Sequence, residues 1–422
     1  MSLPKDPHGD SQVTRLLRWQ AGEKPGPWEV SVFPTNRCNL ACKICWLRWA
    51  LKEFGDCVQD PAGELSDDRL LRLVDEGAEM GVRQWTIVGG GEPMTRGKVV
   101  MEMCERIRAL GMEGTLHTNA TMFSKKQLQQ LVDIGWPRLQ VSLDGPEAEI
   151  NDAIRSPGSF ERATANLRAL RDMRRDKGVT LPLVSLHPVI TRMNVDKLDR
   201  MYELAAELEC TGCSVSHLQV AYENCVPFDL AAEQRERLPE YLMQARRRAS
   251  ELGLQHNLDL FIEGESESLP QEPDMPEPIL NARCYEPWLT AVITNDGRVG
   301  PCCVFDNDVE AESLRDMSLR EAWTGTYMER ARKVILKRGM LKYCQQCPSY
   351  ILPRMMNVRW TYVQEHLPLT QGDSEPRAYE GMSWRQWAGT LAGRTWSTLR
   401  EQGMAGTVRR AREWYAVHVR RR

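Results

Sequence analysis

The alternation of short apolar segments with longer amphipathic ones is the feature that most restricts how this chain can fold. Strands that alternate with helices predict a parallel sheet with right-handed crossovers, so we expect an α/β fold, a partial (β/α)6 TIM-like barrel. In such sheets, functional residues lie beyond the C-terminal ends of the strands. The predicted strands are rich in Val, Ile, Leu and Thr and are bounded by turn-forming residues: Glu29–Thr35, Gln84–Gly89, Gly114–Asn119, Arg138–Asp144, Leu183–Thr191 and Cys213–Val220.

The segments between these strands carry the capping residues of helices. Ser66, Ser124 and Ser159 are typical N-caps, and Gly81 and Gly135 are typical of the residues that end a helix. Further along, the pattern predicts a long helix, a tight hairpin turn and a second long helix: Asp229–Gly253, Asn295–Gly297 and Leu319–Arg338.

Composition divides the chain into five parts. Residues 264–278 concentrate Glu, Ser and Pro, which is typical of a linker. The predicted parts are an N-terminal extension, the barrel, the linker, a second module with the hairpin, and a C-terminal extension with basic helices: 1–28, 29–263, 264–281, 282–350 and 351–422.

The 422 residues hold thirteen cysteines, with no N-terminal secretion signal and no apolar segment of the ~18 residues that span a bilayer. Such usage predicts a reducing, cytoplasmic setting in which cysteines serve metals or catalysis. Residues 383–422 hold nine arginines and two glutamates, with interleaved tryptophans. This basic amphipathic tail suggests peripheral membrane contact, or a packed helix with a solvated basic face. We expect no nucleic-acid partner, because no known binding module accompanies the tail.

Three cysteines directly follow the first predicted strand. Cys38, Cys42 and Cys45 have the spacing C-x3-C-x2-C. The spacing would also place three small residues on one helix face, but a proline and two asparagines make a regular helix poor here. A zinc site would need a fourth ligand, and no His, Asp or Glu lies between Thr35 and Leu51. Three thiolates can hold a [4Fe–4S] cluster and leave one iron open for a chelating ligand.

This cysteine motif, at this place in an α/β barrel, resembles that of the radical SAM superfamily. The resemblance implies that the open iron binds S-adenosylmethionine (SAM), whose reductive cleavage gives a 5′-deoxyadenosyl radical that abstracts hydrogen from a substrate. The chain departs from the family pattern at Ile44, where an aromatic residue is usual, and Trp46 follows the third cysteine. Trp46 is therefore a candidate for packing against the adenine.

Other residues after the predicted strands match the family's SAM-binding positions. The segment Gly89–Pro93 resembles the family's GGEP element, in which Glu92 would meet the SAM ammonium. The resemblance implies further contacts to SAM, although each residue could instead be a turn or capping residue: Gly90, Gly91, Asn119, Ser142, Asp144 and Arg155. The histidines near strand ends are candidates on the substrate side: His117, His187 and His217.

A second cysteine group accompanies the hairpin. Its order is C-x12-G-x4-C followed by C-x2-C, formed by Cys284, Cys302, Cys344 and Cys347. Four cysteines at these spacings would also suit structural zinc. After the radical SAM motif, however, the pattern resembles the SPASM and twitch modules. The resemblance implies one auxiliary [4Fe–4S] cluster, which would carry electrons rather than bind substrate.

Two further cysteines, Cys57 and Cys225, lie in loops beyond strand ends. A thiol there could donate a hydrogen atom to a substrate radical, as in the radical SAM epimerases that this chain partly resembles, or could be an exposed cysteine without a role.

These features together predict a radical SAM oxidoreductase. We expect oxidation or epimerisation of a small molecule, carbohydrate-like or lipid-linked, with flavodoxin or ferredoxin as reductant. Residues 1–28 are too few for a winged-helix domain that binds a peptide leader, which argues against a peptide substrate. The alternatives are a peptide-maturing (RiPP-type) radical SAM enzyme, and a non-catalytic protein that binds iron–sulfur or zinc.

Overall fold

The computed structural model describes residues 11–220, 222–262, 279, 282, 284–305, 310–344 and 347. All of them belong to the unit Met1–Pro368. The predicted basic helices of the tail and nearly all of the predicted linker lie outside the described residues. In the part of the chain that is described, no helix has the length and apolar character needed to cross a bilayer.

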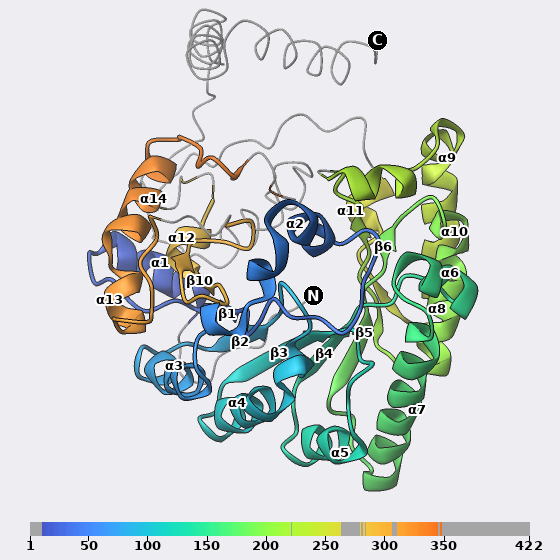
Figure 1. The fold of residues 1–422 in the computed structure, drawn as a ribbon, viewed down its shortest axis with the longest axis horizontal. Coiled ribbons are helices and arrows are strands. Elements are labelled where there is room, and N and C mark those ends of the chain that lie inside the picture. The colour runs from blue at the N-terminus through green and yellow to red at the C-terminus, as the bar shows by residue number, and fades with distance from the viewer. Residues whose placement is uncertain are drawn as a thin grey trace, which may run out of the picture. The chain divides into compact units, whose positions relative to one another are not determined.

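A curved sheet of nine strands organises the fold (Figure 1), in the order β11-β10-β1-β2-β3-β4-β5-β7-β9. All neighbouring strands are parallel except β10 and β11. This arrangement confirms the predicted α/β class with a partial barrel. The strands are β1 (Glu29–Val32), β2 (Gln84–Ile87), β3 (Glu113–Thr118), β4 (Arg138–Val141), β5 (Leu183–Leu186), β7 (Gly212–Cys213), β9 (Gln255–His256), β10 (Thr290–Ile293) and β11 (Val299–Gly300). Two short strands, β6 (Val189–Ile190) and β8 (Ser216–His217), pair separately.

The helices of the described residues are α1 (Gln12–Gln20), α2 (Trp46–Phe54), α3 (Asp67–Glu79), α4 (Gly97–Ala109), α5 (Lys125–Asp133), α6 (Ala148–Ile154), α7 (Ser159–Lys177), α8 (Leu198–Glu207), α9 (Ala232–Glu236), α10 (Leu238–Glu251), α11 (Asp259–Ile262), α12 (Glu286–Leu289), α13 (Leu319–Trp323) and α14 (Thr326–Leu336). Helices α3, α4, α5, α7 and α8 cover the outer, convex face of the sheet, and α2 lies away from that face (Figure 1). Short 3-10 turns add η1 (Gly55–Gln59), η2 (Pro61–Gly63), η3 (Pro93–Arg96), η4 (Val195–Lys197) and η5 (Glu223–Phe228). The predicted N-caps Ser66 and Ser124 are confirmed, since each hydroxyl accepts a backbone N–H of its helix.

Side chains alternate along the strands between an apolar and a polar face. Trp85, Leu116 and Leu139 are buried in the main core, whereas the residues that directly follow them, Thr86, His117 and Gln140, are polar and half-buried. The register places His117 of β3 beside Gln140 of β4. Because the apolar face packs on the helices, the polar face lines the concave side of the sheet.

Some predicted elements differ from the observed ones. The two long single helices are each broken: Pro239 lies in the first turn of α10, where proline starts a new helix, and Gly325 is the N-cap of α14. The sixth predicted strand is split into β7 and β8, and a further short strand, β9, pairs with β7. Helix α1 lies in the predicted N-terminal extension, for which the sequence pattern had indicated no particular element.

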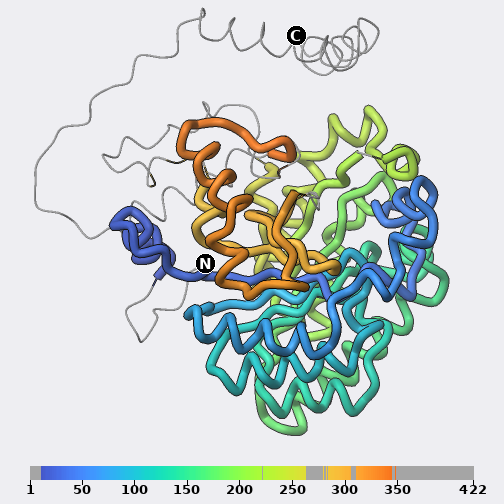
Figure 2. Tube along the Cα trace, turned by 60° about the vertical axis from the view of Figure 1, so that its left-hand side comes forward, coloured from blue at the N-terminus to red at the C-terminus, as the bar shows by residue number. Residues whose placement is uncertain are grey.

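The second module joins the barrel sheet directly. Strand β10 pairs in parallel with β1, with Ala291 opposite Val30. Figure 2 shows α13 and α14 (orange) near α1 (dark blue). The Arg332 guanidinium lies 4.3 Å from the Trp19 ring centroid and 4.4 Å from that of Trp323, and Trp323 Nε1 donates to Pro25 O at 2.9 Å. These contacts tie the N-terminal segment to the second module.

We expect Arg332→Ala to lower the free energy of unfolding by about 2–4 kcal/mol, because it removes a buried cation that packs between two indole rings. Arg332 is 3% exposed. Arg330→Ala, on the same helix, is the matched control, because the Arg330 side chain is 53% exposed and pairs with Glu310 at the surface. Denaturant unfolding of both variants checks this. Equal losses in the two variants would contradict it.

Candidate functional site

The first three cysteines lie in a loop between β1 and α2. None of them is inside a helix, and Cys45 is the N-cap of α2, so the alternative of three residues on one helix face is wrong. The three thiols are half-buried and close enough to affect one another's charge. Burial raises the pKa of each of the three thiols and brings that of Cys42 to about 12. The positive charge of Arg155 opposes this rise at all three. The thiolates that bind iron therefore need the positive charge of the bound metal and of Arg155.

The last residue of α6 and the serine shortly after it fix one side of this cysteine loop. Lys43 N donates to Ile154 O at 2.8 Å, and Ala41 N donates to Ser156 Oγ at 2.8 Å. The position of the loop therefore depends on residues more than a hundred positions away in the sequence.

The turn η5 fixes the other side of the loop. Asn224 Nδ2 donates to Lys43 O at 2.7 Å and to Cys45 O at 3.1 Å. The thiol of Cys225, 1% exposed, donates to Ile44 O at 3.3 Å. The interpretation of Cys225 as an exposed loop cysteine is wrong, because it is buried against the cysteine loop. Its role as a hydrogen-atom donor stays a prediction.

Cys57 lies in η1 and is exposed. Its thiol donates to Phe54 O at 3.0 Å, within its own turn. The structure thus gives Cys57 a local contact, and its predicted role as a hydrogen-atom donor also stays a prediction.

The glycine-rich turn after β2 packs against the cysteine loop. Gly91 N donates to Thr35 O at 3.0 Å, and Glu92 N donates to Arg37 O at 2.9 Å. A Cβ on Gly91 would overlap the backbone of Arg37, and one on Gly90 would meet the Trp46 ring at 3.1 Å. Glycine is required here by this close approach.

We expect Gly91→Ala to displace the cysteine loop and to reduce the iron bound at the first site and the cleavage of SAM by at least about tenfold, since the added methyl meets backbone that cannot rotate away. Gly63→Ala is the matched control, because nothing lies near a Cβ at that loop glycine. Iron content and 5′-deoxyadenosine formation are the measurements. Full activity of the Gly91 variant would contradict the expectation.

Glu92 is 3% exposed and accepts three hydrogen bonds. Its carboxylate takes these from Thr118 Oγ1 at 2.6 Å, Asn119 N at 2.7 Å and Met94 N at 3.1 Å. Burial raises the pKa of Glu92, and these hydrogen bonds oppose the rise. The arrangement holds one carboxyl group at the C-terminal ends of β2 and β3, beside Cys38.

Asp144 and Arg155 form a buried ion pair close to the cysteines. Arg155 Nε lies 2.8 Å from Asp144 Oδ2, with the Asp144 side chain fully buried. Asp144 Oδ1 accepts from Val189 N at 2.8 Å. Burial alone would lower the pKa of Arg155, but Asp144 and Cys42 outweigh it, and the pKa is raised. The guanidinium thus stays charged close to Cys42 and Cys45.

The structure also brings the remaining predicted SAM contacts to this end of the sheet. Asn119 Nδ2 donates to Asn39 Oδ1 at 2.9 Å, which ties β3 to the cysteine loop. Ser142 follows β4, with its N–H bonded to Thr118 O at 2.9 Å. Trp46 begins α2 and is 37% exposed. The predicted set therefore converges around the three thiols, and its role toward SAM stays a prediction.

Two histidines of the concave face lie near this group. Burial lowers the pKa of His117 to about 4 and lowers that of His187, which also senses Asp144 and Arg155. His187 Nε2 lies 2.9 Å from Ser216 Oγ. Both imidazoles are therefore neutral at neutral pH. The third predicted histidine, His217, packs edge-on against the ring of Phe261.

The second cysteine group surrounds the hairpin. Burial raises the pKa of Cys302, which also senses Cys303 and Cys284. Burial likewise raises the pKa of Cys344, and Cys347 lies close enough to contribute. The ring of Tyr343, 2% exposed, lies near both Cys302 and Cys344. The structure thus gathers all four predicted auxiliary ligands in one module.

The donor sets fit iron–sulfur clusters. Among the described residues, no three His, Cys, Asp or Glu side chains meet closely enough around one metal ion. The thiolates of a cubane each bind a different iron atom and need not meet at a point. Cys38, Cys42 and Cys45 would hold one cluster with an open iron, and the four later cysteines would hold a second.

Comparison with known families agrees with this geometry. The profile of the radical SAM superfamily matches residues 32–205. Residues 32–205 therefore match a radical SAM domain, as the first cysteine motif predicts. The profile of the SPASM iron–sulfur cluster-binding domain matches residues 284–348. The two matches together are those of a radical SAM domain followed by a C-terminal SPASM module, and the second match favours iron–sulfur over zinc at the later cysteines.

Curated relatives match one or both modules. The AdoMet-dependent heme synthase of Methanosarcina barkeri is 32% identical over 43% of this chain and 46% of its own length. The mycofactocin maturase MftC of Mycolicibacterium smegmatis is 32% identical over 51% of this chain and 50% of its own length. The chain thus spans about half the length of these relatives. The PqqA peptide cyclase of Xanthomonas campestris pv. campestris is 29% identical over 77% of this chain and 80% of its own length.

A solved structure shares the fold. SuiB of Streptococcus suis has a TM-score of 0.58 at 16% identity, covering 79% of this chain and 75% of that chain. Among the relatives, the PqqA peptide cyclase acts on a peptide, as its name states. This finding contradicts our expectation of a carbohydrate-like substrate. The argument against a peptide from the short segment before β1 does not hold, because the length of that segment does not determine the substrate.

Proposed function

We propose that this chain modifies a peptide by radical SAM chemistry, with net oxidation of the peptide. The observation that carries the proposal is the length of the match to the PqqA peptide cyclase. Its 334 aligned residues exceed the barrel and extend into the SPASM module, whereas the match to the heme synthase covers 182 residues. A relative that shares both modules is the better guide to substrate class.

The residues of the site support this chemistry. When bound, the reduced cluster and SAM supply the power to abstract hydrogen from carbon. The three thiols of the cysteine loop would hold the cluster. Glu92 and Arg155 offer opposite charges, suited to the ammonium and carboxylate groups of SAM. The polar concave face, with the neutral imidazoles of His117 and His187, offers hydrogen-bonding groups to a peptide.

The SPASM module supports net oxidation. Loss of one hydrogen atom from a peptide carbon leaves an electron that must be removed to complete the oxidation. Four thiolates saturate a cluster, which makes it an electron carrier. Strand β10 pairs with β1, and β1 leads into the cysteine loop, so the carrier is attached to the same sheet as the reacting site.

The test uses anaerobically reconstituted protein, SAM, dithionite and the short peptides encoded beside its gene. We expect one peptide to lose the mass of a pair of hydrogen atoms, and we expect that peptide to stimulate 5′-deoxyadenosine formation. The variant lacking Cys38, Cys42 and Cys45 is the control for the chemistry. If every such peptide stays unmodified while SAM is cleaved at an unstimulated rate, the peptide proposal is rejected.

A further inference from the structure

A cavity of about 510 Å³ opens beside the segment that leads into the cluster cysteines. The loop after β1, the start of α3 and the region after β11 contribute to it. Its charged lining residues are five arginines and two carboxylates, so the lining is net positive: Arg37, Arg69, Arg72, Arg96, Arg315, Glu64 and Asp67.

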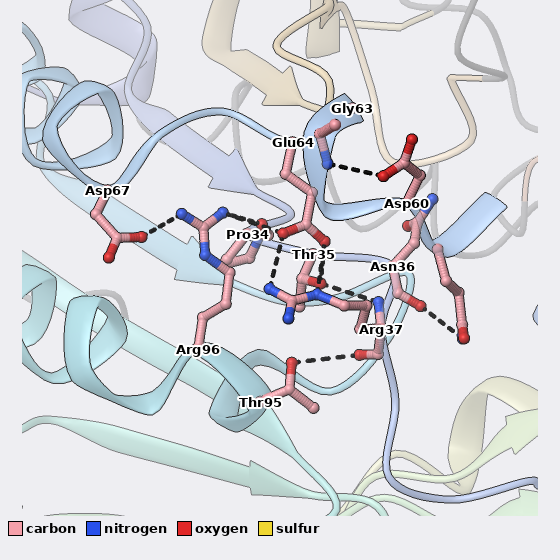
Figure 3. Close-up of polar contacts among 12 residues, drawn as sticks. Pro34, Thr35, Asn36, Arg37, Asp60, Gly63, Glu64, Asp67, Thr95 and Arg96 are labelled. Atoms are coloured by element: carbon pink, nitrogen blue, oxygen red, sulfur yellow. Dashed lines mark hydrogen bonds and ion pairs between the residues drawn. The ribbon is translucent and has the colours of Figure 1, made fainter. Parts of the chain in front are cut away.

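Carboxylates fix the inner arginines in place (Figure 3). Glu64 is 8% exposed, and its Oε2 lies 3.0 Å from Arg37 Nη2 and 3.6 Å from Arg96 Nη1. Its Oε1 accepts a hydrogen bond from the Thr35 hydroxyl. Arg96 also pairs with Asp67. The inner wall is therefore a rigid, already neutralised network.

Two arginines at the rim of the cavity lack a carboxylate partner. The buried Arg69 pairs with Glu76 at 2.7 Å, but the exposed Arg72 forms no hydrogen bond or ion pair with any described residue. The exposed Arg315 donates to the backbone carbonyls of Gly63 and Glu64 and has no carboxylate partner within the described ranges. Arg72 and Arg315 thus present positive charge to an outside partner.

This cavity adjoins the redox centre along the chain. Arg37 contributes its guanidinium to the cavity and is followed directly by Cys38. Its carbonyl accepts from Glu92 N at 2.9 Å, on the side of the site. One residue of the cavity wall is therefore the direct neighbour in sequence of a predicted cluster ligand. Each reductive cleavage of SAM needs one electron from outside the enzyme.

We propose that this arginine cavity, with Arg72 and Arg315 at its rim, is the docking surface for an acidic one-electron carrier protein of the flavodoxin or ferredoxin class. The carrier is oxidised by one electron, and that electron reduces the cluster held by Cys38, Cys42 and Cys45. Acidic surface on such a carrier would complement the positive rim and speed encounter. The inference rests on the radical SAM chemistry and is independent of the peptide substrate.

The test measures SAM cleavage by the reconstituted full chain with either of two reductants. With reduced flavodoxin, we expect the Arg72→Glu/Arg315→Glu variant to raise the apparent KM for flavodoxin by about tenfold. With dithionite, which needs no docking surface, we expect the rate to be unchanged. Titration calorimetry with oxidised flavodoxin should show the same weakening. Raising the salt concentration should raise the wild-type KM and affect the variant less.

The matched control is Arg247→Glu on α10, an exposed arginine that has no partner among the described residues and lies beyond the far end of the sheet order. It should leave the KM for flavodoxin unchanged. An unchanged KM in the double variant would overturn the proposal. An equal loss with flavodoxin and dithionite would also overturn it, because the arginines would then serve the fold. Failure of the peptide test would leave this dithionite comparison intact.

Discussion

Alanine in place of Cys38, Cys42 and Cys45 should abolish the cleavage of SAM and halve the iron bound by the protein. Wild-type protein reconstituted without oxygen should hold about eight iron atoms in two cubanes. The triple variant should keep about four, because the SPASM cysteines lie in a module with its own hairpin. Iron analysis and 5′-deoxyadenosine formation are the measurements.

The exposed Cys57 provides the matched control for this experiment. Cys57→Ala should keep the full iron content, because its thiol bonds only within its own turn. About twelve iron atoms in the wild type would contradict a single auxiliary cluster. Complete loss of iron in the triple variant would contradict two independent cluster sites.

Much of the site could be predicted because its signals are local in sequence. The spacing of Cys38, Cys42 and Cys45 lies within one short loop, and Glu92 sits in a glycine-rich turn one strand later. The parallel sheet then brings the ends of neighbouring strands together. Asn119 and Asp144 follow the third and fourth strands and converge on the cysteines for the same reason.

The residues that hold the loop could not be predicted in this way. Asn224 bonds Lys43 and Cys45 from a turn about 180 positions away, and no spacing rule links an asparagine to such distant carbonyls. The contribution of Thr118 to the site could have been predicted from the sequence, because Thr118 immediately precedes the candidate Asn119 on a predicted strand. The pairing of β10 with β1 was also missed, since a hairpin signal says nothing about which sheet edge the hairpin joins.

The sequence also failed to predict the class of substrate, and the reason is again physical. The residues singled out in the sequence are those expected to bind the cluster and SAM, whose chemistry is the same for many substrates. The side chains on the concave face of the sheet are ordinary half-buried polar residues, such as Gln140 and Ser185. These follow from strand alternation alone and carry no substrate signature.

Arg155→Met should destabilise the protein by about 3–5 kcal/mol, because it leaves the Asp144 carboxylate buried without its counter-charge. Asp144 is fully buried and the side chain of Arg155 is 11% exposed, so solvent cannot replace the missing partner. Denaturant unfolding of reconstituted protein with matched iron content measures this loss.

The double variant Asp144→Asn/Arg155→Met separates the stability of the fold from the binding of SAM. Asparagine keeps the oxygen that accepts from Val189 N and removes the unpaired charge, so most of the lost stability should return. Binding of SAM should stay weak in both variants, because neither has the guanidinium beside Cys42 and Cys45. Recovery of SAM binding together with stability would show that Arg155 serves only to neutralise Asp144.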